Sequence, residues 1–495
     1  MPLAQIRQRI TQVLAELNIT HLRDRLTDQL SGGQKQACVL AAILALDTPI
    51  IVLDEPIAAL DPAGKQLVGQ VVERLKALGK TLIVSDPNLE WFQHLVDQTL
   101  VLSPDGRLLY SGELREFLSN RALLEQSHIP RPALTDLSFA LQQSGYDLPV
   151  WVEFAEANRW ISTVLGAGKA TTSTATGHPA RAGLLSPQGE QSALPSAYGS
   201  RAPVEFARSA PPSVPASVPP SAPVVDCVDL TFTYADAPTP ALSAVSFSAN
   251  AGQLLGIIGQ NGSGKSTAVR HLNGLLRPQT GVVMVSGQQV ARQTVAQMAR
   301  RVGMAFQSPD LMLFNETVEQ EALFSVSLAH DARWQQQRRL EVEALLEQFG
   351  LAEYRTRSPL ALSVAQKQLL SILCALSLDP EVLVLDEPTF GMDQRGREQL
   401  GQILRQLKQQ HKTILCISHD LPLLADYADQ LLVFQGGQVA ARGSTRSLLA
   451  NSELFTQLHI PLPSYIQLGT DWFHQSGLTP AELAHCLVAA LPAVH

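Results

Sequence analysis

Short apolar runs alternate with longer amphipathic stretches through the C-terminal part of the chain. The runs LLGIIG (254–259), VLVLDE (382–387) and TILCIS (413–418) are bounded by polar turns. Between them lie stretches with helical spacing of apolar positions, such as RRLEVEALLEQFG (338–350). Parallel strands that are buried on both faces and joined by crossover helices give this alternation. The pattern predicts an α/β fold built on a parallel sheet.

An internal repeat shows that part of this pattern occurs twice. Three pairs of segments match at a constant offset of 332 residues: LSGGQKQ (30–36) with LSVAQKQ (362–368), IIVLDEP (50–56) with VLVLDEP (382–388), and ALD (59–61) with GMD (391–393). At this offset Met1 aligns with Arg333, so residues 223–332 have no counterpart in the first copy. We therefore predict a partial domain at residues 1–160, with an exposed sheet edge, and a complete domain at residues 223–495.

Residues 161–222 between the copies are rich in Ala, Ser, Pro and Gly, as in SAPPSVPASVPPSAP (209–223). Such a segment cannot bury enough apolar surface to offset the entropy of ordering, so we predict a disordered linker. The sequence GAGKATT (166–172) within it resembles a phosphate loop. It lacks the first glycine and a preceding strand, so we do not assign it a function.

Composition and charge narrow the functional classes. The 495 residues carry a net charge of −8 and form no basic stripe, which argues against nucleic-acid binding. Five scattered cysteines without C-x-x-C spacing are typical of reduced thiols in a cytosolic protein. The chain opens with no signal peptide and has no apolar stretch near the ~20 residues of a membrane span. We expect any role at a membrane to be exerted from its surface, through a partner.

The sequence GQNGSGKS (259–266) carries the strongest chemical signal. It fits the G-x-x-x-x-G-K-[ST] pattern, follows an apolar run and precedes a helical stretch. Its glycines let backbone N–H groups surround phosphate, and the helix N-terminus favours an anion. Lys265 is predicted to reach the β- and γ-phosphates, and Ser266 to ligate Mg²⁺. The predicted nucleotide-binding residues here are Gly259, Gln260, Asn261, Gly262, Ser263, Gly264, Lys265, Ser266 and Thr267.

Two carboxylates end the apolar run at 382–387. Asp386 is predicted to hold Mg²⁺, and Glu387 to polarise the attacking water. Taken alone, an apolar run ending in Asp-Glu-Pro is an ordinary transition from strand to turn. The phosphate loop upstream favours the catalytic interpretation.

Together these motifs resemble the ATP-binding-cassette (ABC) family of P-loop ATPases. LSGGQKQ (30–36) is similar to the family's signature peptide, and DEP, D-loop and SHD elements follow at family spacing. The resemblance covers nearly the whole chain except the linker. It implies an ABC nucleotide-binding domain with a parallel-sheet core and a helical subdomain, in tandem with an incomplete first copy. It also implies ATP and Mg²⁺ as cofactors.

The resemblance assigns roles to three further residues. Tyr234 matches the aromatic residue that stacks on adenine, although a core aromatic on a strand is the alternative. Gln307 matches the glutamine that senses Mg²⁺ and the γ-phosphate. His419 matches the switch histidine at the γ-phosphate, and a structural histidine is the alternative.

The stretch FQSPDLMLFNETVEQEALF (306–324) resembles the ATPases of energy-coupling-factor importers, which take up vitamins or transition metals. In that family two ATPase domains drive a transmembrane coupling subunit, and a small membrane subunit captures substrate. The resemblance implies these two partners, a docking role for the segment after Gln307, and a peripheral location at the cytoplasmic face of the cell membrane.

Family members pair their domains head to tail, with each ATP between the phosphate loop of one and the signature of the other. One such site is intact here, and its signature residues are Ser31, Gly32, Gly33 and Gln34. The opposite site has no phosphate loop in this sequence, has Asp86 where a histidine is expected, and has Val364 and Ala365 in place of two glycines. An aspartate there would repel phosphate, and Cβ atoms would hinder its approach. We predict one active composite site, with Asp54 and Glu55 on the silent side.

Other functions remain open at this point. A tandem-cassette ATPase acting on ribosomes or DNA is disfavoured by the acidic charge and the uncharged linker. A sugar-importer ATPase is disfavoured because its second copy is usually the degenerate one. A fragment that only binds or regulates is the last alternative. The transported substrate does not follow from this sequence, because in the family other subunits select it.

Overall fold

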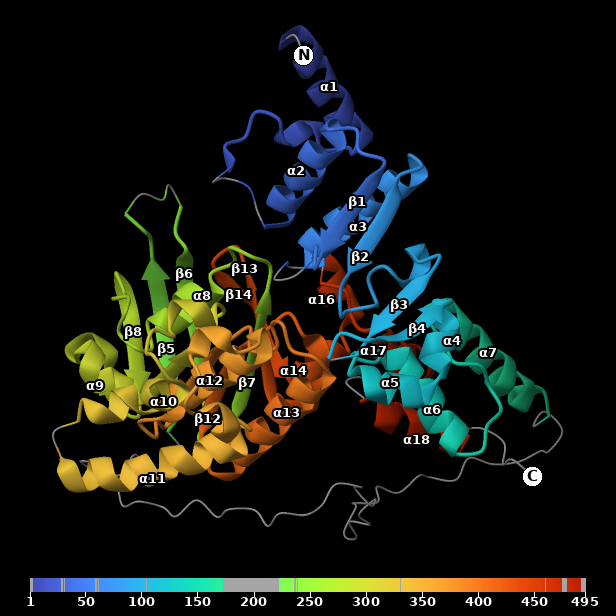
Figure 1. Cartoon of the computed structure of the whole chain (residues 1–495). Coiled ribbons are helices and arrows are strands. Elements are labelled where there is room, and N and C mark those ends of the chain that lie inside the picture. Colours follow the sequence, from blue (N-terminus) through green and yellow to red (C-terminus); the bar gives the residue numbers. More distant parts are fainter. Residues whose placement is uncertain are drawn as a thin grey trace.

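The computed structural model describes residues 3–171 and 222–490, apart from residues 28, 29, 31, 58, 59, 61, 104, 236, 238, 330, 459 and 474–478 (Figure 1). We call the part before residue 172 the first copy and the part after residue 221 the complete domain. Most of the predicted linker, residues 172–221, lies outside the described residues.

A six-stranded sheet forms the centre of the complete domain, in the spatial order β10–β11–β12–β7–β13–β14. Its strands are β7 (Leu254–Gly259), β10 (Val302–Ala305), β11 (Val382–Asp386), β12 (Thr413–Ile417), β13 (Gln430–Gln435) and β14 (Gln438–Ser444). All neighbours are parallel except β13 and β14. The predicted parallel α/β core is confirmed.

Strands β7, β11 and β12 are buried along their whole length, so both faces of this sheet are covered at its centre. Successive side chains of a strand point to opposite faces. Leu383 and Leu385 therefore pack into one core with the surrounding helices, while Val382 and Val384 pack into a second core with the antiparallel sheet. Burial on both faces is the physical reason that these strands read as continuous apolar runs.

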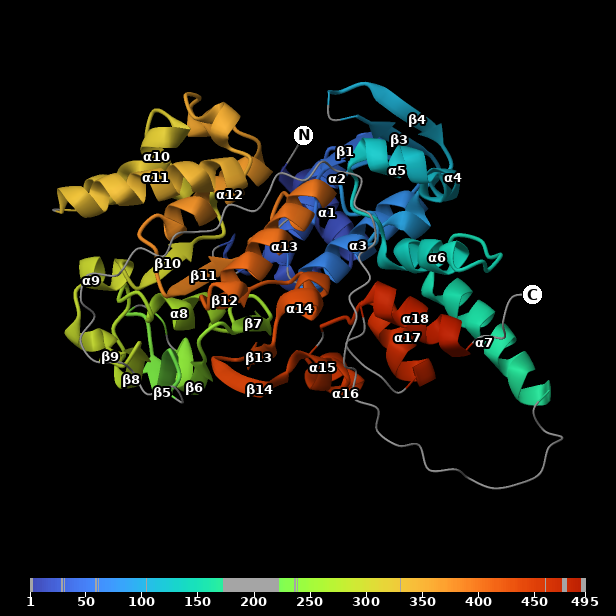
Figure 2. The same ribbon diagram turned by 90° about the horizontal axis from the view of Figure 1, so that it is seen from below.

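An antiparallel sheet, in the order β6–β5–β8–β9, covers the second core. Its strands are β5 (Val225–Phe232), β6 (Leu242–Ala249), β8 (Thr280–Val285) and β9 (Gln288–Gln289). The helices of the complete domain are α8 (Lys265–Arg270), α9 (Val295–Ala299), α10 (Val318–Ser327), α11 (Ala332–Gln348), α12 (Val364–Leu376), α13 (Gln394–Gln409), α14 (Leu421–Tyr427), α15 (Thr445–Leu449), α16 (Ser452–Gln457), α17 (Ser464–Phe473) and α18 (Pro480–Ala490). Helices α10–α12 and the antiparallel sheet lie at opposite ends of this domain (Figure 2).

The first copy contains only part of this architecture. Its strands are β1 (Ile50–Asp54), β2 (Thr81–Ser85), β3 (Thr99–Leu102) and β4 (Leu108–Gly112), and its helices are α1 (Leu3–Glu16), α2 (Gly32–Ala45), α3 (Pro62–Ala77), α4 (Leu114–Ser119), α5 (Arg121–Ser127), α6 (Ala133–Gln143) and α7 (Phe154–Thr171). Strands β1 and β2 pair in parallel, and β3 and β4 form a separate antiparallel pair. Only one face of β1 is buried, in contrast to the fully buried β11.

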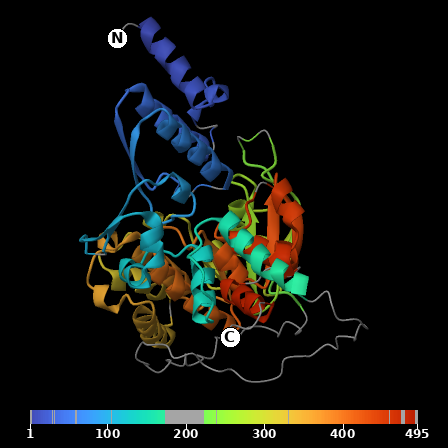
Figure 3. The same ribbon diagram turned by 90° about the vertical axis from the view of Figure 1, so that its right-hand side faces the viewer.

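Helices from both copies pack together at the C-terminal ends of the two repeats. Helix α6 packs on α17 and α18, and Trp472 Nε1 donates to Asn158 Oδ1 at 2.8 Å between α17 and α7 (Figures 2 and 3). Helix α7 continues past residue 160, where the sequence placed the start of the linker, because Ile161 is fully buried. Within the described residues, every helix is too short or too polar to cross a lipid bilayer.

Candidate functional site

The phosphate loop connects strand β7 to helix α8, as the motif predicts. Gly264 has φ of 101°, and a Cβ there would lie 2.7 Å from the carbonyl oxygen of Ala241. Only glycine fits such a position, so the chain can close tightly before the helix starts. Lys265 is buried, and its Nζ donates to the carbonyl oxygens of Gly259 (2.7 Å) and Gln260 (2.8 Å). The loop therefore holds an ammonium group where phosphate oxygens would lie.

Ser266 and Asp386 meet at the start of α8 and the end of β11. Ser266 Oγ donates to Asp386 Oδ2 at 2.9 Å. Burial raises the pKa of Asp386, while the Ser266 hydroxyl and the Lys265 ammonium oppose this rise. A hydroxyl and a carboxylate are hard oxygen ligands of the type that Mg²⁺ prefers, and Mg²⁺ commonly takes the rest of its ligands from phosphate and water. This pair fits a magnesium ion bound together with a nucleotide.

Glu387 follows Asp386 at the same strand end and lies against His419. Its Oε2 accepts from the backbone N–H of His419 at 3.1 Å, and its Oε1 lies 3.5 Å from His419 Nε2. Burial raises the pKa of Glu387 to about 7, and the Asp386 carboxylate contributes to the rise. A carboxylate with this pKa is matched to accept a proton from water near neutral pH.

His419 also reaches the phosphate loop. Its Nε2 lies 3.3 Å from the Asn261 Oδ1 atom. The imidazole therefore lies between the phosphate loop and Glu387. The role of His419 as a switch residue at the γ-phosphate stays a prediction.

Tyr234 lies beside the phosphate loop on the chain that follows β5. Its hydroxyl is 3.2 Å from Thr267 Oγ1, and its ring packs edge-to-face on Phe232 at 4.9 Å between centroids. The side chain is 39% exposed, so it is not a core aromatic. One face of the Tyr234 ring can therefore stack on a nucleotide base beside the phosphate loop.

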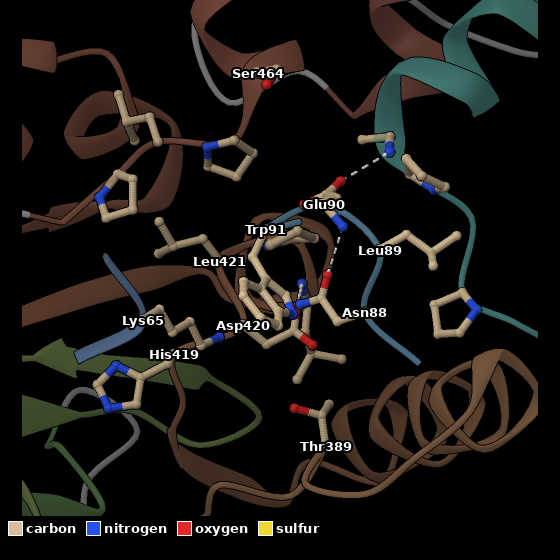
Figure 4. A pocket seen from close by; sticks show the side chains of 18 of the residues that line it. Lys65, Asn88, Leu89, Glu90, Trp91, Thr389, His419, Asp420, Leu421 and Ser464 are labelled. Atoms are coloured by element: carbon tan, nitrogen blue, oxygen red, sulfur yellow. Dashed lines mark hydrogen bonds between the residues drawn. The ribbon is translucent and has the colours of Figure 1, made fainter. Parts of the chain in front are cut away.

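A cavity of about 1320 Å³ lies between the first copy and the complete domain. Gln307, Glu387 and His419 line it from the complete domain, and Glu55 and Asp86 line it from the first copy. Figure 4 shows Lys65 and Trp91 of the first copy and His419 and Asp420 of the complete domain together among the residues that line this cavity. The structure thus brings the three predicted catalytic residues to one cavity, together with Glu55, the counterpart of Glu387 in the first copy.

The register of the strands corrects the position that the sequence assigned to Asp86. Asp54 pairs with Ser85, and Asp386 pairs with Ile417, so Ser85 is the counterpart of Ile417. Asp86 therefore stands in the place of Ser418, and Pro87 in the place of His419. The repeat offset of 332 gives the same correspondence, so the position expected for a histidine is Pro87 and not Asp86.

Side-chain contacts support this corrected register. Asp86 Oδ1 accepts from the backbone N–H of Asn88 at 2.8 Å, just as Ser418 Oγ accepts from that of Asp420 at 3.0 Å. Asp86 Oδ2 also accepts from Trp91 Nε1 at 3.1 Å, and burial raises its pKa to about 6. Asp86 is thus a turn-forming residue of its own loop, and the switch position of the first copy holds proline.

The signature peptide of the first copy is described only in part. Ser31 lies outside the described residues, while Gly32, Gly33 and Gln34 begin helix α2. A Cβ at Gly33 would lie 2.3 Å from the Gly64 Cα, so this glycine also allows α2 to pack on α3. That packing role was not visible in the sequence, because it joins two helices more than 30 residues apart. The contact of this peptide with a nucleotide stays a prediction.

Further residues of the cavity were missed by sequence reasoning. Glu90 accepts from the backbone N–H of Ala133 at 3.2 Å, and burial raises its pKa. Arg397 forms an ion pair with Asp420. No local motif marks these residues, because they come together only when the two copies pack.

A phosphate loop after a central strand, a serine–aspartate pair for Mg²⁺ and a glutamate–histidine pair define an α/β P-loop ATPase of the ABC class. The sequence model of the family described as "ABC transporter" matches residues 5–58 and 242–390. The chain therefore carries the nucleotide-binding domain of an ABC transporter ATPase, a class that hydrolyses ATP to drive transport.

Individual relatives agree with this class. The chain is 30% identical over 431 residues to an ABC transporter ATP-binding protein of Methanosarcina acetivorans, a match that covers 86% of this chain and 66% of the relative. It is 28% identical over 467 residues to YkoD of Bacillus subtilis, which is named for HMP/thiamine import, with 93% of this chain and 75% of YkoD covered.

Solved structures with similar folds include cbiO1 of Clostridium perfringens, described as part of the ABC transporter complex cbiONQ. It shares 28% identity with this chain at a TM-score of 0.42, and the match covers 49% of this chain and 96% of cbiO1.

Proposed function

We propose that this protein is the ATPase subunit of an energy-coupling-factor type importer of vitamins or transition metals, and that it has one competent ATP site. In this proposal residues 223–495 bind and hydrolyse ATP with Mg²⁺, and residues 1–160 supply the signature peptide across the intramolecular interface. A transmembrane coupling subunit receives the conformational change, and a small membrane subunit selects the substrate. The chain itself binds at the cytoplasmic face of the membrane as a peripheral protein.

The observation that carries this proposal is an exposed apolar patch in the segment that follows Gln307 in the sequence. Its members are Leu311 (85% exposed), Phe314 (67%), Phe324 (37%) and Leu328 (64%). The rings of Phe314 and Phe324 pack edge-to-face at 4.8 Å between centroids. Large apolar side chains exposed together in one segment of a protein surface favour a site of protein–protein contact. The segment is also the one whose sequence resembles the importer ATPases.

The loop that carries this patch is held in place by two polar contacts. The buried Glu321 carboxylate accepts from the backbone N–H groups of Phe314 (2.8 Å) and Asn315 (2.7 Å). Asp310 Oδ1 accepts from Lys367 Nζ at 2.8 Å, which ties the loop to the start of helix α12. A partner bound to the patch would therefore be connected both to Gln307 at the ATP site and to α12.

The intramolecular pairing rests on the C-terminal helices. Helices α6 and α7 of the first copy pack against α17 and α18 of the complete domain. This contact holds the two copies of the chain against each other. The signature peptide is therefore available to the phosphate loop at high effective concentration.

Membrane fractionation with a matched pair of variants tests the proposal. We expect the wild-type chain to sediment with membranes of cells that contain the partner subunits, and to be released by washing at high pH or in urea. Phe314→Asp should lose this association by about tenfold or more, because it places a charge in the apolar contact.

The control is Val228→Asp, since Val228 is also exposed (45%) but lies on β5, far from α10 in Figure 2. Retention of the wild-type chain after washing would show integral insertion and contradict the proposal. Equal loss in both variants would show that the patch is not the docking site.

A further inference from the structure

A three-residue loop carries His419 from strand β12 to helix α14, and both of its ends are fixed. Ser418 Oγ, at the first residue, accepts from the backbone N–H of Asp420 at 3.0 Å. Asp420 Oδ1, at the last residue, accepts from the backbone N–H of Leu423 at 3.1 Å and caps α14. Between them the backbone N–H of His419 donates to Glu387 Oε2 at 3.1 Å. The position of Asp420 therefore determines how this N–H meets the Glu387 carboxylate.

The second carboxylate oxygen of Asp420 connects the loop to helix α13. Asp420 Oδ2 forms an ion pair with Arg397 Nη1, and the Asp420 side chain is only 8% exposed. Removal of one member of such a buried pair leaves an uncompensated charge, which is costly. Arg397 therefore holds Asp420, and with it the loop of His419, in one position against α13.

The first copy lacks this charge pair at the corresponding positions. At the repeat offset of 332, Lys65 is the counterpart of Arg397 and Asn88 is the counterpart of Asp420, and both line the cavity in Figure 4. Asn88 keeps a local turn, because its Oδ1 accepts from the backbone N–H of Glu90 at 3.1 Å. A neutral amide cannot form the ion pair. The pair thus occurs in the copy that has a histidine in this loop, and it is lost in the copy that has a proline there.

Helix α13 also contacts the first copy, one turn before Arg397. The backbone N–H of Gln394, the first residue of α13, donates to the carbonyl oxygen of His128 at 3.2 Å. A helix supplies no acceptor for its first N–H groups, and residues three apart lie on the same face. The counterpart of Gln394 in the first copy is Pro62, which has no N–H to donate. The first copy therefore contacts α13 on the face of Arg397, and the equivalent contact in the opposite direction cannot form.

We propose that Arg397 is a positioning residue for ATP hydrolysis, which holds the His419 loop through Asp420 and connects this loop, through α13, to the first copy. Contact of the first copy with Gln394 fixes the start of α13, and Arg397 fixes Asp420. The loop then presents the His419 N–H to Glu387. Arg397 acts on the reacting atoms only through these residues. The inference rests on the ATPase chemistry of the class and not on the proposed transport role.

The rate of ATP hydrolysis and the affinity for ATP, both measured on the full chain, test this role. Arg397→Gln should lower kcat about tenfold or more and leave the Kd for ATP within about twofold, because the phosphate loop is unchanged. Arg397→Lys keeps the positive charge and should lower kcat less than about threefold. The matched control is Lys408→Gln, which breaks another ion pair of α13, with Asp429 at 2.9 Å, and should change kcat less than about twofold.

Asp420→Asn tests the pair from its other side. Asparagine is also a good N-cap residue, so α14 keeps its cap while the charge is lost. This variant should lower kcat as Arg397→Gln does. The double variant should be no slower than the slower single variant, because either change breaks the same pair. Melting temperatures of all variants show that they are folded.

Gln394→Pro tests the connection to the first copy. Proline fits the first position of a helix, so α13 stays intact while the donor to His128 is removed. We expect kcat to fall about threefold, as for the loss of one hydrogen bond, with ATP binding unchanged.

The proposal is overturned if Arg397→Gln keeps the wild-type kcat, if it weakens ATP binding as much as it lowers kcat, or if Arg397→Lys is as slow as Arg397→Gln. It is also overturned if the losses of the two single variants multiply in the double variant, or if Lys408→Gln is as slow as Arg397→Gln, since the effect would then reflect the stability of α13. A normal kcat for Gln394→Pro would overturn the connection to the first copy.

Discussion

Glu55 and Glu387 have the same left-handed backbone conformation at the ends of equivalent strands. Their φ angles are 41° and 51°, and each donates its backbone N–H to the next strand at 2.8 Å, to Ser85 O and Ile417 O. Non-glycine residues held in this region are strained, and such strain is common at functional sites. The side chains differ, because Glu387 is 14% exposed and bonded to His419, whereas Glu55 is exposed. The two glutamates thus have the same backbone conformation, but their side chains lie in different surroundings.

This difference predicts opposite results for one substitution made in the two copies. Glu387→Gln should abolish steady-state ATP hydrolysis while leaving ATP binding, because the carboxylate polarises water and does not hold phosphate. Glu55→Gln should change the rate less than about twofold, because no phosphate loop in the described residues faces it. ATPase rates of the purified variants, in complex with the membrane partner where one is found, provide the measurement. Equal inactivation by both changes would disprove the one-site model.

The raised pKa of Glu387 predicts the pH dependence of hydrolysis. With a pKa of about 7, the carboxyl is protonated below this pH and cannot accept a proton from water. We expect log kcat to rise with pH up to about 7 and to level off above it. Any rate that remains detectable in Glu387→Gln should lack this dependence. A wild-type profile that stays flat from pH 5.5 to 8 would show that another step limits the rate.

The free energy of unfolding should fall over the pH range in which the rate of hydrolysis rises. The folded protein keeps the Glu387 proton up to about pH 7, whereas an unfolded chain releases it near the ordinary value of 4.5. Between these values the folded state binds more protons, so the free energy of unfolding falls as pH rises. Glu387→Gln should remove this loss, which is at most about 3 kcal/mol. The melting temperature of the nucleotide-free variant should therefore exceed that of the wild type at pH 8 and match it near pH 4.5.

Lys265 is predicted to control nucleotide binding and not only catalysis. It is buried in the phosphate loop, and its ammonium already lies within 2.8 Å of two loop carbonyls. Lys265→Ala removes this charge and should weaken ATP binding by at least about tenfold, as measured by fluorescent-nucleotide titration. Lys367→Ala is a suitable control, because Lys367 forms its ion pair with Asp310 away from the loop. A Lys265→Ala variant that binds ATP normally would contradict the assignment.

The central strands could be predicted from the sequence because burial on both faces makes each one a continuous apolar run. The predicted run at 254–259 coincides with β7, and the runs at 382–387 and 413–418 contain β11 and β12. The residues of the phosphate loop and its strand-end carboxylates were found for a related reason, since their chemistry requires fixed spacing within short segments.

Contacts between distant segments could not be predicted in the same way. Gly33 was interpreted only as a phosphate contact, although it also packs on Gly64. Glu90 and Arg397 line the cavity between the copies only because α6 docks on α17 and α18.

Substitutions at Ser31 and at Ser363 test whether the signature peptide of the first copy completes the ATP site of the complete domain. Ser31→Arg should stop steady-state turnover, because its long side chain would fill the γ-phosphate contact at the start of α2. Gly33→Ala is a poorer test, since a Cβ there would push on Gly64 and disturb α3. The matched control is Ser363→Arg, the same change at the equivalent position of the complete domain, where the predicted site is silent.

Ser363 caps helix α12 by accepting from the backbone N–H of Gln366, so its replacement should cost about 1 kcal/mol of stability. Ser363→Arg should therefore lower the melting temperature slightly and leave the ATPase rate nearly unchanged. Ser31→Arg should instead stop steady-state ATP hydrolysis. If both variants hydrolyse ATP normally, the head-to-tail pairing is wrong. If Ser363→Arg alone is inactive, the competent site is the opposite one, with a phosphate loop that lies outside the described residues.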